Sequence, residues 1–82
     1  MQVGEEKLKR VLANIFNINI DEIDDATSVD SVPQWDSLKH LNLVLALEHE
    51  FNITLSTEQT VEILNYSLIK AVLGEHGIQF KD

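Results

Sequence analysis

The chain has 82 residues, a formal net charge of −8 and a hydrophobic content of 44%. Domains commonly run from about 50 to 250 residues, so we expect residues 1–82 to form a single domain with a modest core. The hydrophobic content is too high for a disordered chain. Because the sequence has no cysteine, it excludes disulfides, a thiolate metal site and a cysteine nucleophile.

The distribution of charge points to the kind of partner. Ten of the fourteen acidic residues lie between residues 21 and 62, where Lys39 is the single basic residue. Such a surface repels phosphate backbones, so we expect no nucleic-acid partner, and it attracts proteins with basic patches. The alternative is that the acidity serves only solubility. The N-terminus does not resemble a signal peptide and no apolar run is long enough to span a membrane, which predicts a cytoplasmic protein.

Residues 4–16 are predicted to form an amphipathic helix. Glu5 and Glu6 lie in the first turn, four residues before Lys9 and Arg10, an orientation that favours a helix. The apolar residues repeat at helical spacing: Leu8, Val11, Leu12, Ile15 and Phe16.

Residues 17–36 have no clear period and are predicted to form a long loop. A loop of this length is uncommon in a compact domain unless it packs on the helices. Apolar residues recur along it and predict such packing: Ile18, Ile20, Ile23, Val29, Val32 and Trp35. Pro33 disfavours helical geometry at Val32 and marks the approach to the next element.

Residues 37–51 are predicted to form a second helix that is apolar over most of its circumference. Such a helix is either central to a bundle or partly exposed for a partner. Positions 41, 44, 47, 48 and 51 share one face. Leu38 and Leu45 lie on another face and are candidates for exposed apolar residues.

The remaining residues predict two further helices. Ser56 and Gln59 form the pattern of a capping box, which predicts a short third helix to about residue 64. Asn65 is a break or a cap before a fourth helix over 66–76, and Gly77 follows at the usual position of a C-terminal glycine. The residues expected to face inward on the fourth helix are Leu68, Ile69, Val72 and Leu73. No alternating strand of useful length is present, so the predicted fold is all-α, a small four-helix bundle with a long first loop and a short third helix.

Ser37 opens the second helix and has two simple interpretations. Serine is a preferred N-cap residue, although Asp36 can serve as the cap and leave the Ser37 hydroxyl free. The other interpretation is a serine hydrolase in which Ser37 is the nucleophile and His40 is the base. This interpretation is disfavoured because a triad also needs an orienting acid and an oxyanion hole, and the sequence lacks the G-x-S-x-G elbow. No catalytic residue is therefore expected.

A specific metal site is not expected either. The aspartates over 21–30 do not follow the calcium-loop order, and no glycine lies between Gly4 and Gly74. His49 and His76 are predicted to be surface residues of their helices.

Asp36-Ser37-Leu38, followed downstream by Leu47-Glu48-His49-Glu50-Phe51, resembles the phosphopantetheine-attachment signature of acyl carrier proteins. The order of the predicted elements is similar over most of the chain. This resemblance implies that a phosphopantetheinyl transferase attaches the 4′-phosphopantetheine of coenzyme A to Ser37, and that the thiol of this arm carries an acyl thioester. It also implies that Asp36 is recognised by the transferase and its metal. A cofactor that brings its own sulfur is consistent with a chain that has no cysteine.

The resemblance implies a monomeric carrier that is not itself an enzyme and that meets acyl-loading and acyl-using enzymes. Trp35, Leu38, Leu45 and Glu48 are expected to shape the docking surface, with Glu48 pairing with basic residues of the partner. Packing in the core or against the loop is the favoured position for Trp35, since an exposed indole is costly. Such interfaces are expected to be small, transient and salt-sensitive.

The chain departs from the commonest family pattern just before and just after the attachment motif. Gln34 and Trp35 stand where a glycine and a small residue are usual, and Lys39 and His40 stand where acidic residues are frequent. These departures favour a dedicated pathway of lipid or secondary-metabolite biosynthesis. Two alternatives stay open: a D-alanyl or other aminoacyl carrier, and a small acidic helical interaction module with unmodified Ser37.

Overall fold

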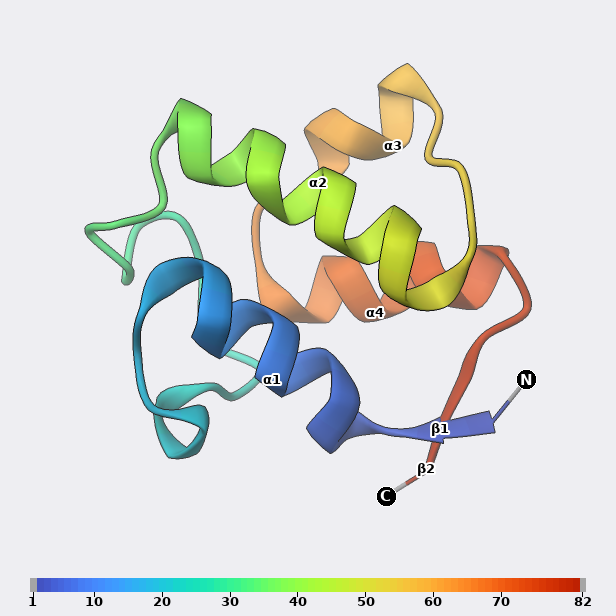
Figure 1. The fold of residues 1–82 in the computed structure, drawn as a ribbon, viewed down its shortest axis with the longest axis horizontal. Coiled ribbons are helices and arrows are strands. Elements are labelled where there is room, and N and C mark those ends of the chain that lie inside the picture. The colour runs from blue at the N-terminus through green and yellow to red at the C-terminus, as the bar shows by residue number, and fades with distance from the viewer. Residues whose placement is uncertain (1, 82) are drawn as a thin grey trace.

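The computed structural model describes residues 2–81, and within them four α-helices pack around one hydrophobic core (Figure 1). The elements in chain order are β1 (Gln2–Gly4), α1 (Glu5–Phe16), the 3₁₀ turn η1 (Ile20–Glu22), α2 (Ser37–Phe51), α3 (Thr57–Glu62), α4 (Tyr66–Glu75) and β2 (Gln79–Lys81). The predicted helical bundle with a long first loop and a short third helix is confirmed. The all-α description omits one small sheet.

The core is built mainly by α1, α2 and α4. Helix α1 buries Leu8, Leu12 and Phe16 completely and packs against α2. Each apolar residue taken out of water contributes about 1.5–3 kcal/mol, so these helical faces supply most of the stabilising burial. The long loop also packs on the helices as predicted, because Ile23, Val32 and Trp35 are buried.

Asparagine, serine and glycine set the helix ends. Asn17 and Asn52 end α1 and α2 in the left-handed region, at φ 56° and 54°, where asparagine is tolerated better than most residues. The capping box of α3 forms as predicted, with Gln59 N–H donating to Ser56 Oγ at 3.1 Å. Asn65 caps α4, and Gly77 follows at φ 86°.

One expectation about the fourth helix is wrong, and one small sheet was not predicted. Leu68 is 40% exposed instead of facing inward, since α3 covers less of α4 than a longer helix would. The two strands were not expected. They pair in parallel with Val3 opposite Phe80, and the Phe80 ring meets Phe51 edge-on at 6.3 Å between centroids. Strands of three residues are too short to show a period, and their partners lie at opposite ends of the sequence.

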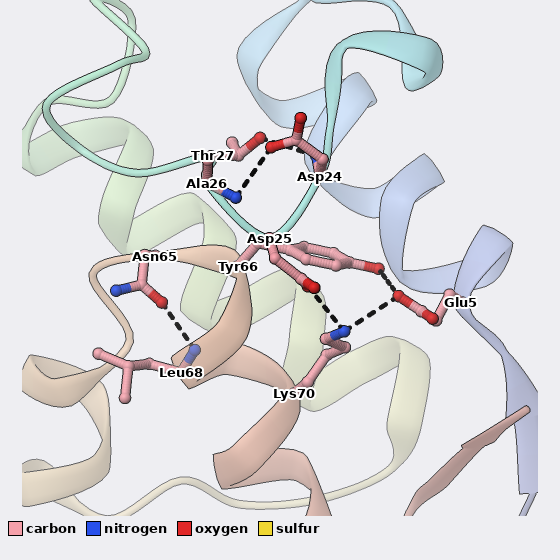
Figure 2. A network of polar contacts seen from close by, with 9 residues as sticks. All are labelled: Glu5, Asp24, Asp25, Ala26, Thr27, Asn65, Tyr66, Leu68 and Lys70. Atoms are coloured by element: carbon pink, nitrogen blue, oxygen red, sulfur yellow. Dashed lines mark hydrogen bonds and ion pairs between the residues drawn. The ribbon is translucent and has the colours of Figure 1, made fainter. Parts of the chain in front are cut away.

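A polar network ties α4 to the start of α1 and to the long loop (Figure 2). The fully buried Tyr66 donates its hydroxyl to Glu5 Oε1 at 2.9 Å. Lys70 Nζ lies 3.2 Å from the same oxygen and 2.9 Å from Asp25 Oδ1. The loop is also held directly, because the Tyr66 N–H donates to the Thr27 carbonyl at 2.9 Å.

These contacts shift the pKa values of the network away from neutrality. The Tyr66 hydrogen bond, helped by Lys70, lowers the pKa of Glu5. The hydrogen bond to Asp25 raises the pKa of Lys70, and burial with the Glu5 hydrogen bond raises the pKa of Tyr66. An acid whose pKa is lowered by folding stabilises the fold at pH values above its unfolded-state pKa. This stabilisation is lost as pH falls through the folded-state pKa. The network therefore stabilises the fold at neutral pH and weakens on acidification.

Replacement of Tyr66 by Phe tests this network. We expect the free energy of unfolding to fall by about 1.5 kcal/mol, the usual contribution of a hydrogen bond to a charged group. The loss of stability on acidification should also become smaller, because the largest cause of the lowered Glu5 pKa, the Tyr66 hydrogen bond, is removed, whereas Lys70 still lowers that pKa. Urea denaturation at several pH values measures both effects.

Glu6→Gln is the matched control for this substitution. Glu6 pairs with Arg10 on the open surface of α1, with both side chains about two-thirds exposed. An exposed pair of this kind contributes less than about 0.5 kcal/mol. A Tyr66→Phe protein as stable as this control, with the wild-type pH profile, would show that the network does not stabilise the fold.

Candidate functional site

Asp36, and not Ser37, caps the second helix. Its backbone is extended and its Oδ1 accepts the Lys39 N–H at 2.9 Å, while its carbonyl accepts the His40 N–H at 2.8 Å. The interpretation of Ser37 as the N-cap is therefore wrong. The alternative, in which Asp36 caps the helix, is confirmed.

Ser37 is consequently the first residue of α2, and its side chain is exposed. No hydrogen bond of its hydroxyl is present among residues 2–81. The backbone N–H groups of Ser37 and Leu38 have no acceptor within the helix, because the first turn lacks preceding carbonyls. An anion attached to Ser37 would lie at the positive end of the helix dipole, which fits a phosphodiester at this hydroxyl. The nearby Asp36 carboxylate opposes such an anion, although it is itself held by the cap.

A hollow of about 510 Å³ lies beside Ser37. It is formed where the end of the long loop, the first turn of α2 and the end of α3 meet. Its walls are mostly apolar, which suits the aliphatic parts of a tethered group. The lining residues are Val29, Trp35, Asp36, Ser37, His40, Val61 and Leu64.

His40 is held by both of its ring nitrogens. Trp35 Nε1 donates to His40 Nδ1 at 3.0 Å, and His40 Nε2 lies 2.7 Å from the Thr60 carbonyl oxygen. An indole nitrogen can only donate, so Nδ1 is the acceptor and Nε2 carries the proton that is donated to Thr60. Neither nitrogen is available to take a proton from Ser37.

Trp35 lies in the core, as the packing interpretation predicted. It is 7% exposed, and its ring centroid is 4.7 Å from that of Phe16. The further expectation that Trp35 shapes a docking surface is limited to the edge of the indole that lines the hollow.

The other predicted docking residues differ in how open they are. Leu38 and Leu45 are exposed as expected, at 66% and 56%. Glu48 is half-buried, and its Oε2 accepts the Leu55 N–H at 2.8 Å, so this carboxylate holds the chain that follows α2. A carboxylate engaged in this way is less free to pair with a partner than the sequence analysis assumed.

Sequence reasoning missed part of the exposed apolar surface. Leu41 shares its helix face with residues 44, 47 and 51, which are buried, yet it is about as exposed as Leu45 and lies one turn from Leu38. Val61 and Leu64 are also exposed and line the hollow. The sequence signal available for this exposure is the short length of α3, because a helix of six residues buries few of its side chains.

Within residues 2–81 no group of three or more His, Cys, Asp or Glu side chains is placed to hold a metal ion. None of the described helices combines the length and the apolar character needed to cross a membrane.

Residues 2–81 thus form a small helical domain with an exposed serine at the start of its second helix, beside a hollow. No family model matches the chain. A curated relative is the acyl carrier protein of Buchnera aphidicola subsp. Schizaphis graminum (strain Sg), which is 33% identical over 60 residues. The match covers 72% of this chain and 75% of the relative. The chain belongs to the acyl carrier protein family, whose members bear a phosphopantetheine group and serve acyl-handling enzymes.

Substitution of the two residues at the start of α2 separates their structural roles. We expect Asp36→Ala to lower the free energy of unfolding by about 1 kcal/mol, the usual cost of losing a cap. We expect Ser37→Ala to change it by less than about 0.5 kcal/mol, as for an exposed position without partners. Chemical denaturation of both variants measures the difference, and a larger cost for Ser37→Ala would contradict the assignment of the cap.

Proposed function

We propose that this protein carries an acyl group as a thioester on a 4′-phosphopantetheine arm attached to Ser37 Oγ. The exposed Ser37 hydroxyl, left free by the Asp36 cap at the positive end of α2, is the observation that carries this proposal. Family membership supports it. The chain contributes the attachment point and the docking surface, and partner enzymes perform the chemistry.

The residues around Ser37 have distinct roles in this proposal. Asp36 fixes the start of α2 and so keeps the hydroxyl accessible. By family resemblance it is also recognised by the transferase and its metal. The free N–H groups of the first turn face the phosphodiester. The bound arm supplies the thiol that the cysteine-free chain lacks.

Docking is proposed to occur on the exposed side of α2. Leu38 and Leu45 offer apolar contact close to Ser37. The net charge of −8 favours partners with basic patches and speeds their encounter at low salt. Glu48 takes part only through Oε1, since its Oε2 accepts the Leu55 N–H.

An acyl cargo is favoured over an aminoacyl cargo by the name of the curated relative. Service in a dedicated pathway is proposed from Trp35 and His40. Together these two residues build the wall of the hollow beside the attachment point. We further propose that the protein is monomeric and cytoplasmic. Residues 1–82 form one carrier domain in this proposal.

Loading with coenzyme A tests the proposed attachment. The protein is incubated with coenzyme A, magnesium and a promiscuous phosphopantetheinyl transferase. We expect the intact mass to rise by one phosphopantetheine group, with no rise in Ser37→Ala, because the modified hydroxyl has been removed. Ser67→Ala is the matched control, since Ser67 is also an exposed serine in the first turn of a helix, and it should load normally.

Two outcomes of the loading experiment would count against the carrier function. An unchanged wild-type mass would favour the unmodified interaction module. A mass gain that persists in Ser37→Ala would place the arm on another residue.

Leu38→Gln and Leu45→Gln test the docking surface. We expect each to raise the KM of the transferase about fivefold, because about 1 kcal/mol of apolar contact is lost. The free energy of unfolding should stay within about 0.5 kcal/mol of wild type, since both side chains are exposed. Leu68→Gln, a partly exposed leucine on α4, is the control, and an equal effect there would mean that docking does not use α2.

A further inference from the structure

An aromatic pair closes the hollow beside Ser37 on its inner side. Trp35 lines the hollow, yet it is almost fully buried, because its ring packs on Phe16 at the end of α1. The His40 ring lies 6.3 Å from the indole at an interplanar angle of 23°. These rings fill the space between the hollow and the core.

His40 also connects two helices, α2 and α3. Its Nε2–H donates to the Thr60 carbonyl and so joins α2 to α3. A helix of six residues is not stable alone, so the position of α3 depends on its contacts. Its other anchors lie elsewhere: Ile63 follows it into the core, and Gln59 bonds to Glu75 and His76 near the end of α4.

We propose that His40 is a positioning residue that limits how far a group tethered to Ser37 enters the bundle. It holds Trp35 across the floor of the hollow and α3 against α2, so the cargo stays in the open hollow. This inference rests on the proposed carrier function. It assigns the protein to compact or short acyl groups, because the hollow that the described residues form beside Ser37 is open and does not enclose a long flexible chain.

The physical reason lies in the two hydrogen bonds. Entry of a chain between α2 and α3 would displace the indole or pull Thr60 away from His40. The Trp35 N–H and the Thr60 carbonyl would then lose their partners at part-buried positions, which opposes the gain from burying methylene groups. Removal of the imidazole abolishes this link and opens the space that the ring occupied.

Chain-length dependence of stability tests the proposal. The transferase is supplied with acetyl-coenzyme A or octanoyl-coenzyme A, and intact mass confirms each acyl product. The proteins are wild type, His40→Ala, His40→Gln and the control His49→Ala, which removes an exposed histidine from the same helix. Circular dichroism measures the Tm of each acetyl and octanoyl form.

We expect the octanoyl form of His40→Ala to melt about 4 °C or more above its acetyl form, because the chain is buried in the opened space. Wild type and His49→Ala should show a difference below about 1 °C. His40→Gln should behave as wild type, since its amide offers both an acceptor and a donor. In a second measurement, hydroxylamine should cleave the octanoyl thioester more slowly in His40→Ala than in wild type.

Three results separate the possibilities. Octanoyl stabilisation of wild type as large as that of His40→Ala would overturn the proposal, and it is measurable even if His40→Ala does not fold. A merely structural His40 would lower Tm equally in both acyl forms and leave their difference at zero, which also overturns it. Failure of any form to gain mass would instead reject the carrier function itself.

Discussion

The hydrogen bond from the Lys39 N–H to the Asp36 carboxylate fixes where α2 begins, and the site depends on that boundary. It makes Ser37 the first helical residue and leaves its hydroxyl free. Since side chains repeat every 3.6 residues, the same boundary sets the direction of every later residue of α2. Leu43 and Leu47 enter the core, while Leu38 and Leu45 stay outside. One short contact thus couples the exposure of Ser37, the exposed apolar side of α2 and the packing of the core.

Trp35 and His40 give this carrier its own character. Immediately before the cap, the indole turns into the core and packs on Phe16, so the long loop is fixed at its end. One turn into α2, His40 accepts from that indole and donates to Thr60. A glycine or small residue in place of Trp35 would remove the indole that lines the hollow beside Ser37. Trp35 and His40, two of the four residues that differ from the usual family pattern, therefore shape the space next to Ser37.

Local signals in the sequence were sufficient to predict the helices. The apolar repeat of α1 and the Ser56–Gln59 capping box depend on neighbours within a turn or two, and both formed as predicted. The strands, the network between Glu5 and Tyr66 and the bridge through His40 join distant segments, which periodicity cannot reveal. The local motif was sufficient to predict that α2 begins at Ser37. The exposure of Leu41 could not be predicted in this way, because it depends on how much of α2 is covered by neighbouring segments.

The parallel pairing of β1 with β2 joins the two ends of the described chain, and this separation sets when it can form. Closing so long a loop costs chain entropy that the turns within helices do not incur. The packing of α1 near α4, with its Tyr66–Glu5 hydrogen bond, already brings the two ends of the chain close together. Strand pairing then holds Phe80 edge-on against Phe51. The first turn of α2 at Ser37 takes no part in this closure and is held by the Asp36 cap instead.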